Sequence, residues 1–187
     1  MRGVFRLHAE GVQHVPRGGA VIGANHTSNF DPWPLAFPLW PDRQLYFMAK
    51  AELFNPLLGP PLRAGGAFPV RRGEQDVEAI EAAVELCREG KIVAMFPEGT
   101  RRVKGVRKKF AARPHSGAAR VGLAADVPIV PAAISGTDRL ARLSRLAVAY
   151  GAPVPVDDLA GIPPRDAATV ATERLMTAIE TLLDGLE

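Results

Sequence analysis

The sequence has little cysteine and no long apolar segment. Cys87 is the one cysteine among 187 residues, which excludes an intrachain disulfide framework and favours a reducing compartment. No run approaches about 18 uninterrupted apolar residues, and Met1 is followed by Arg and Gly rather than by the apolar core of a signal peptide. We therefore expect a protein that neither spans a membrane nor carries an evident export signal.

Acidic residues are absent from one stretch of the chain. The overall balance of 23 Lys and Arg against 20 Asp and Glu is nearly even. Between residues 101 and 113, however, seven residues are basic and none is acidic: Arg101, Arg102, Lys104, Arg107, Lys108, Lys109 and Arg113. This basic run predicts an anionic neighbour or, alternatively, only exposure to water. Nucleic acid is not expected, because the run has one aromatic residue and no recognised reading motif.

Short apolar runs between turn signals predict buried strands at residues 20–25, 45–49, 67–70, 91–96, 128–135 and 147–154. Residues 74–88 follow helical spacing and end before Gly90, with one face formed by Val77, Ile80, Val84 and Cys87. A second amphipathic helix, about 166–183, directs these side chains to a core: Val170, Leu175, Met176, Ile179, Leu182 and Leu183. Strands alternating with helices predict an α/β fold with one largely parallel or mixed sheet covered by helices.

A histidine and an aspartate stand five residues apart in "NHTSNFDP", residues 25–32. On an α-helix this spacing would place them on different faces, so they can meet only across a turn. Asp31 before Pro32 is a favoured helix N-cap with proline at the first helical position. The turn can bring the Asp31 carboxylate to His26, which would then be a general base held by an acid. The alternative is that Asp31 only caps the helix and His26 is an ordinary loop histidine.

No nucleophilic side chain is evident beside this pair. Ser28 has no further support as a nucleophile, and Cys87 is expected to pack in the core. A base at His26 would therefore activate a group that the substrate brings.

Two further turns carry arginine. "MFPEGTRR", residues 95–102, leaves a strand into a glycine turn, and "GAFPVRRG", residues 66–73, places Arg71 and Arg72 after another strand. Arginine beside turn amides can hold a phosphate, because its planar fork binds two oxygens at once. Glu98 is expected to orient an arginine or to contact a substrate hydroxyl. The alternative for each turn is an exposed loop with solvated charges.

Together these stretches resemble the glycerolipid acyltransferase family, specifically the 1-acylglycerol-3-phosphate (lysophosphatidic acid) acyltransferases. The four motifs of that family are matched in order by His26 and Asp31, by residues 66–72, by "FPEGTR" at residues 96–101 and by "VPIVPAAI" at residues 127–134. With "MAKAELF" at residues 48–54, the resemblance covers about residues 5–155. It implies a glycerol-3-phosphate acyltransferase-like α/β fold and a single acyltransferase domain over residues 1–187.

The resemblance also implies a reaction, in which a fatty acyl thioester acylates the sn-2 hydroxyl of 1-acylglycerol 3-phosphate to give phosphatidic acid in phospholipid synthesis. His26 would take the proton of that hydroxyl, and Asp31 would steady His26. The residues implied to hold the glycerol phosphate are Arg72, Gly99, Thr100 and Arg101, with Glu98 ordering the pocket. No metal, cofactor or covalent enzyme intermediate is implied, and the acyl donor is a substrate carried by coenzyme A or by acyl carrier protein.

An enzyme acting on such a lipid must meet a bilayer, so we expect a cytoplasmic protein that is peripheral to the inner face of the membrane. Trp33, Phe37 and Trp40 suit the headgroup level, and the alternative for them is core packing. The basic run can face an anionic leaflet, the phosphates of coenzyme A or acyl carrier protein. Many family members carry a hydrophobic helical stretch before the first motif, whereas 25 residues precede His26 here. Either the enzyme is peripheral or the chain lacks its natural start.

Two other functions stay open at this stage. The acceptor can be glycerol 3-phosphate or another lysophospholipid, or the chain can be a non-catalytic lipid-binding module that keeps the fold. A dinucleotide-binding oxidoreductase is disfavoured, because "GANHTS" after the first predicted strand lacks the three-glycine fingerprint.

Overall fold

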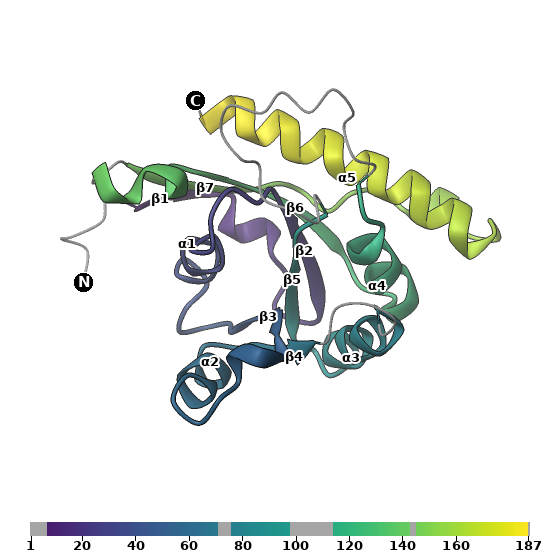
Figure 1. Cartoon of the computed structure of the whole chain (residues 1–187). Helices are drawn as coiled ribbons and strands as arrows, with labels where there is room; N and C mark the ends of the chain where they lie inside the picture. The colour runs from purple at the N-terminus through teal and green to yellow at the C-terminus, as the bar shows by residue number, and fades with distance from the viewer. Residues whose placement is uncertain (1–6, 71–75, 98–113, 143–144, 187) are drawn as a thin grey trace, which may run out of the picture.

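A computed structural model of the chain describes residues 7–70, 76–97, 114–142 and 145–186. In these ranges seven strands form one sheet in the order β1-β7-β6-β2-β5-β3-β4 (Figure 1). The strands are β1 (Leu7–Glu10), β2 (Ala20–Ala24), β3 (Leu45–Lys50), β4 (Ala67–Val70), β5 (Ile92–Met95), β6 (Ile129–Ser135) and β7 (Leu146–Tyr150). All pairs are parallel except β6 and β7, which run antiparallel. This confirms the predicted fold class, a largely parallel sheet covered by helices.

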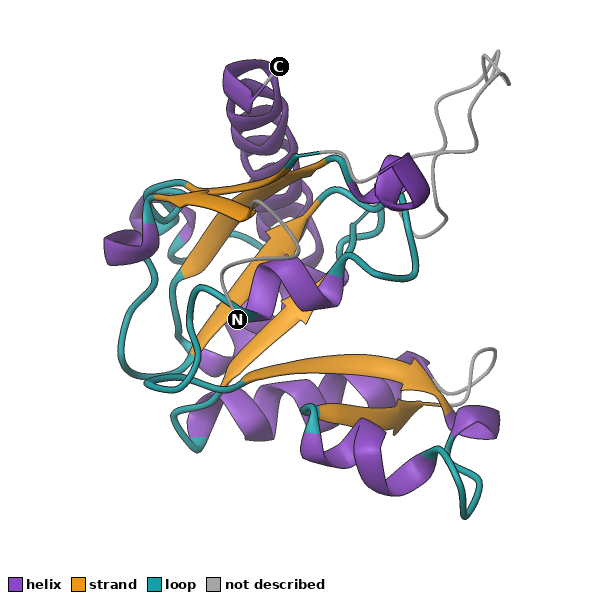
Figure 2. Cartoon of the chain, turned by 90° about the vertical axis from the view of Figure 1, so that its left-hand side faces the viewer, coloured by secondary structure: helices purple, strands orange, loops and turns teal. Residues whose placement is uncertain are grey.

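Helices cover both faces of the sheet (Figures 1 and 2). The α-helices are α1 (Pro32–Ala36), α2 (Gly59–Ala64), α3 (Asp76–Arg88), α4 (Gly117–Ala125) and α5 (Pro164–Leu186). Short 3-10 helices are η1 (Val12–His14), η2 (Ala51–Leu53), η3 (Thr137–Arg142) and η4 (Asp157–Leu159). One hydrophobic core lies between the sheet and the helices α3, α4 and α5. A second core lies on the opposite face, beneath α1.

The central strand β2 is buried along its whole length. Val21 faces the core under α3, α4 and α5, whereas Ala20, Ile22 and Ala24 face the other core. Gly23 contacts α5 so closely that an added Cβ would lie 2.6 Å from a methyl carbon of Leu175. A strand with both faces covered reads as an uninterrupted apolar run, which is why residues 20–24 were predictable from sequence.

The connections from two adjacent strands leave the sheet in opposite directions. β2 continues through α1 to β3, which lies on one side of it, and β5 continues through α4 to β6, which lies on the other. Because α1 and α4 pack on opposite faces, a topological switch point lies between β2 and β5, and a crevice is expected outside their carboxyl ends. In open α/β sheets this is the position where ligands bind.

Several predicted elements need correction. The strand predicted at 147–154 ends at Tyr150. Val77 was predicted to face the core, but it is 55% exposed because it lies in the first turn of α3. β1 and α4 were not predicted, since β1 is a short, half-buried edge strand and the Gly- and Ala-rich α4 lacks a clear polar face.

Candidate active site

The loop that leaves β2 is fixed to the neighbouring strand by a buried asparagine. The side-chain amide of Asn25 donates to the carbonyl oxygen of Ile134 at 2.9 Å and accepts from its N–H at 2.8 Å. These two bonds continue the pairing of β2 with β6 beyond the last residue of β2, using a side chain instead of the backbone. His26 therefore leaves the sheet at a fixed point, at the edge of the crevice.

The structure brings His26 and Asp31 together, as the turn between them predicts. His26 Nδ1 lies 2.7 Å from Asp31 Oδ2. The same oxygen accepts the backbone N–H groups of Thr27 at 2.7 Å and Ser28 at 2.8 Å. The carboxylate thus closes the turn from the inside and holds the loop that carries the histidine.

The predicted capping role of Asp31 is wrong in one respect. Pro32 does occupy the start of α1, and Asp31 lies at the N-cap position, but its side chain makes no capping hydrogen bond to the helix. Its backbone is already helical, with φ −54° and ψ −36°. The carboxylate instead points back at the preceding loop, so its hydrogen bonds serve the His26 turn.

Asp31 is completely buried and remains an acid of low pKa. Burial alone would raise the pKa of this carboxyl. Four hydrogen bonds outweigh burial and hold the pKa below its usual range; the donors, in order of effect, are His26, the Ser28 N–H, the Thr137 hydroxyl and the Thr27 N–H. The carboxylate is therefore ionised at neutral pH and can only accept hydrogen bonds.

The histidine is oriented by this carboxylate. Because Asp31 only accepts, Nδ1 of neutral His26 carries the proton and Nε2 presents a lone pair. The imidazole stacks on Phe96, with 4.3 Å between ring centroids and 20° between planes. Its side chain is 19% exposed, and no described residue hydrogen-bonds Nε2. The result is a histidine held on two sides, with a basic nitrogen to which no residue in the described part of the chain hydrogen-bonds.

Phe96 directly follows β5, the neighbour of β2 in the sheet. The predicted phosphate-binding residues all lie outside the described residues: Arg72, Glu98, Gly99, Thr100 and Arg101. The whole basic run, residues 101–113, also lies there. The described residues therefore include the base and its acid, and the phosphate pocket stays a prediction.

Sequence reasoning gave no role to Asn25, Phe96 or Thr137. Each acts through a contact made across the sheet, because their partners are Ile134, His26 and Asp31. The one available signal was their position, since each stands at the carboxyl end of one of the three adjacent strands β2, β5 and β6.

Aromatic side chains cover the surface beside the pair. Phe30, Trp33, Phe37 and Trp40 recur at spacings of three and four residues and are between 54% and 66% exposed. Core packing, the alternative weighed for the last three, is therefore wrong. Trp33, Phe37 and Trp40 border a groove of about 250 Å³ between α1 and the end of α2.

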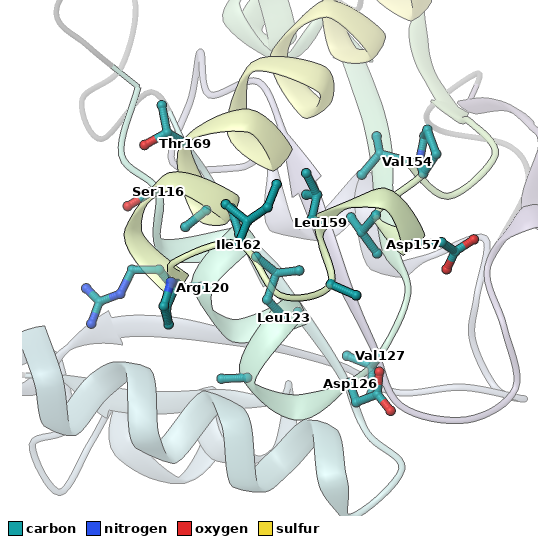
Figure 3. Close-up of a pocket in the computed structure, with 18 of the residues that line it drawn as sticks. Ser116, Arg120, Leu123, Asp126, Val127, Val154, Asp157, Leu159, Ile162 and Thr169 are labelled. Atoms are coloured by element: carbon teal, nitrogen blue, oxygen red, sulfur yellow. The ribbon is translucent and has the colours of Figure 1, made fainter.

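A larger hollow of about 1410 Å³ lies elsewhere, between α4, η4 and the start of α5 (Figure 3). Leu123, Val127, Leu159 and Ile162 contribute much of its apolar wall, with Arg120 at one end (Figure 3). The residues described around it include neither histidine nor cysteine. Its carboxylates, Asp126 and Asp157, have no histidine partner among the described lining residues, whereas His26 is held by Asp31.

Comparison with known proteins identifies the family of this chain. A sequence profile of the family described as Acyltransferase matches residues 6–135. The 1-acyl-sn-glycerol-3-phosphate acyltransferase of Bacillus subtilis is 32% identical over 173 residues, which cover 90% of this chain and 83% of that protein. The enzyme of the same name from Streptococcus pneumoniae is 30% identical, and the match covers 87% of this chain and 60% of that protein.

A solved structure has the same fold. The crystal structure of the 1-acyl-sn-glycerophosphate acyltransferase PlsC from Thermotoga maritima is similar with a TM-score of 0.65 over 95% of this chain and 72% of that chain. The two sequences are 24% identical, so this likeness concerns the fold. Among the helices described here, none is long and apolar enough to cross a membrane. The profile match over more than half of the chain and the 32% identical relative show that this chain belongs to the acyltransferase family.

Proposed function

We propose that this protein transfers a fatty acyl group from a thioester donor to the sn-2 hydroxyl of 1-acylglycerol 3-phosphate and so makes phosphatidic acid. The observation that carries the proposal is the His26–Asp31 pair, 2.7 Å apart, at the carboxyl ends of β2 and β5. The names of the relatives from Bacillus subtilis and Streptococcus pneumoniae supply the acceptor.

In the proposed reaction His26 Nε2 takes the proton of the acceptor hydroxyl while that oxygen attacks the thioester carbonyl. Asp31, ionised and buried, stabilises the imidazolium that forms at 2.7 Å from its carboxylate. The tetrahedral intermediate then expels the thiolate, which leaves with the proton held by His26. The ester bond forms as the thioester bond breaks, and no metal or cofactor takes part.

The nucleophile belongs to the substrate in this scheme. Cys87 is buried in the core under α3, and burial raises the pKa of its thiol to about 11. It is therefore unsuited to form an acyl-enzyme. The donor is acyl coenzyme A or an acyl carrier protein thioester, and the proposed holders of the glycerol phosphate stay Arg72, Glu98, Gly99, Thr100 and Arg101.

The acceptor has a lipid tail, so the protein must work at a bilayer surface. We propose that the aromatic surface of Phe30, Trp33, Phe37 and Trp40 rests at the headgroup level, because large aromatic side chains favour that depth. Asp31 directly precedes α1, the short helix that carries Trp33, so this contact would bring the His26–Asp31 pair close to the lipid. The protein would then be peripheral to the inner face of the membrane, with the cytoplasmic thioester pool on its other side.

The first experiment follows free thiol from palmitoyl coenzyme A, with and without lysophosphatidic acid, in the parent and in His26→Ala. We expect release that depends on the acceptor, phosphatidic acid in the mass spectrum, and a loss of roughly 10²- to 10⁴-fold in the variant. Since Cys87 is buried, the protein's own thiol gives little background.

His8→Ala is the matched control, because the His8 side chain is 55% exposed. It should retain the parent's rate. Parallel assays with acyl carrier protein thioesters, glycerol 3-phosphate and other lysophospholipids identify the donor and the acceptor. Equal rates for the parent and His26→Ala would contradict the role of His26 as the base. If none of these substrates is turned over, the proposed acyltransferase activity is wrong.

A further inference from the structure

The two oxygens of the Asp31 carboxylate are held from two distant parts of the chain. Oδ2 is held by the local loop, through His26 and two backbone N–H groups. Oδ1 accepts a 2.6 Å hydrogen bond from the hydroxyl of Thr137, which lies 106 residues away in sequence at the start of η3. The Thr27 hydroxyl stands 3.4 Å from Oδ1, too far for a strong bond. Among the described residues Thr137 alone therefore holds the second oxygen at short range.

The protons of the two hydroxyl groups can be assigned. Thr137 has one hydroxyl proton, and the ionised carboxylate at 2.6 Å is its strongest acceptor. The Thr27 hydroxyl lies 2.9 Å from the Thr137 oxygen, so Thr27 is the donor in that contact. Two hydroxyls in series thus point their protons toward Asp31, which strengthens the final bond to the carboxylate.

The backbone leaves Thr137 little freedom. Thr137 is only 2% exposed. Gly136, directly before it, has φ +90°, and a Cβ there would lie 2.2 Å from the carbonyl oxygen of Arg145. Only glycine fits this turn. β6, which leads into the turn, is paired with β2 and is held beyond it by Asn25.

From this geometry we infer that Thr137 is a positioning residue for acyl transfer: its hydroxyl stops the Asp31 carboxylate from rotating and so keeps His26 Nε2 directed into the crevice. The inference rests on the proposed function, in which His26 is the base. Thr137 touches neither substrate nor His26 in this role, and it acts only through Asp31.

Removal of the hydroxyl has two expected consequences. The carboxylate gains freedom to turn about its Cβ–Cγ bond, so fewer of the bound complexes have His26 correctly directed. Asp31 also loses a hydrogen bond that favours its charged form, so its pKa rises.

The test compares Thr137→Val, which keeps the shape, with Thr137→Ser, which keeps the hydroxyl. Thr172→Val is the matched control, because the buried Thr172 hydroxyl donates to the Ala168 carbonyl oxygen at 2.6 Å within α5. We expect kcat to fall roughly tenfold to a hundredfold in Thr137→Val, with little change in KM. Thr137→Ser should recover most of the rate, and Thr172→Val should match the parent.

A second measurement separates this inference from the proposed function. In protein labelled with ¹⁵N-histidine, which has four histidines in all, the proton on His26 Nδ1 gives a signal that His26→Gln identifies. The signal should shift or broaden in Thr137→Val and return in Thr137→Ser, whether or not acyl transfer is detected. If Thr137→Val leaves the signal and kcat unchanged, or if Thr172→Val changes them equally, Thr137 has no positioning role. If the His26 signal changes in Thr137→Val as expected but the parent protein turns over none of the substrates, the acyl-transfer proposal is wrong.

Discussion

The loop before α1 and the surface of α1 show opposite arrangements of polar and apolar groups. In the loop, the carboxylate of Asp31 and the amide of Asn25 are buried, and both are hydrogen-bonded. Four aromatic side chains are nevertheless more than half exposed: Phe30 within the same loop, and Trp33, Phe37 and Trp40, which follow Asp31. Folding alone would favour the reverse, since burial costs polar groups free energy and stabilises apolar ones.

This contrast separates two requirements of the site. The buried polar groups fix one histidine, and their cost is offset because each is hydrogen-bonded. The exposed aromatic side chains contribute little to the stability of the fold, so contact with a partner outside the described residues explains their exposure best. Changes in the loop should therefore alter rate and stability together, whereas changes on the aromatic surface should alter lipid contact alone.

The largest expected effect is that of Asp31→Asn on activity. The neutral amide cannot stabilise the imidazolium and can present an NH₂ group to His26, so kcat should fall by roughly 10³- to 10⁴-fold in the thioester assay. Asp158→Asn is the matched control, since Asp158 is 59% exposed and pairs with Arg174. Activity of Asp31→Asn within threefold of the parent would remove the carboxylate from the mechanism.

The Asp31→Asn variant also tests how the free energy of unfolding depends on pH. The folded pKa of Asp31 is below the ordinary value of 3.8, so its hydrogen bonds stabilise the fold fully above that value. This stabilisation is lost as pH falls through the folded pKa. The parent should exceed Asp31→Asn by roughly 2–3 kcal/mol in free energy of unfolding at neutral pH, and the gap should shrink below about pH 4. Urea titrations at several pH values measure it, and a gap that is constant down to pH 3 would be the opposite result.

Asn25→Ala should come next, with a loss of roughly 2 kcal/mol in the free energy of unfolding. The change leaves the Ile134 N–H and carbonyl without their side-chain partner at a buried position. Asn55→Ala makes the control, because the Asn55 side chain also makes two hydrogen bonds to the backbone, here by accepting from the Leu57 and Leu58 N–H groups in an exposed loop. Equal losses in the two variants, measured by urea unfolding, would show that burial of the Asn25 bonds is unimportant.

The smallest effect on the fold is expected from Trp33→Ser combined with Trp40→Ser. Their exposed positions predict a change of no more than about 0.5 kcal/mol in the free energy of unfolding. Sedimentation with vesicles of phosphatidylglycerol and phosphatidylcholine should nevertheless show binding weaker by about tenfold. Val77→Ser removes an equally exposed apolar group on α3 and should bind as the parent does. Undiminished binding of the double variant would place the lipid contact elsewhere.

Most of the sheet was predictable because its inner strands are buried on both faces. Five of the six predicted strands match β2 to β6 within one or two residues, and the helices α3 and α5 were found from their periodicity. The failures have the opposite character. β1 is an edge strand stabilised by its pairing with β7, and α4 has small side chains that make sense only when packed against α3 and α5.

The site was predictable only where its parts are neighbours in sequence. His26 and Asp31 share one turn, so their spacing and the proline after them were sufficient to predict their contact. Thr137 donates to the same carboxylate from across the pairing of β2 with β6, and Phe96 stacks on the imidazole from the end of β5. Such contacts depend on strand order and register, which local patterns do not specify.

The attachment of Asp31 to Thr137 also has a consequence for the order of folding. A loop closed by a residue 106 positions away can become rigid only after β6 has paired with β2, and contacts of such sequence separation are slow to form. The amides of Thr27 and Ser28, which donate to Asp31, should therefore exchange with deuterium at rates set by opening of the whole sheet rather than of the loop. A refolding chain would acquire its sheet before it acquires a correctly aimed histidine.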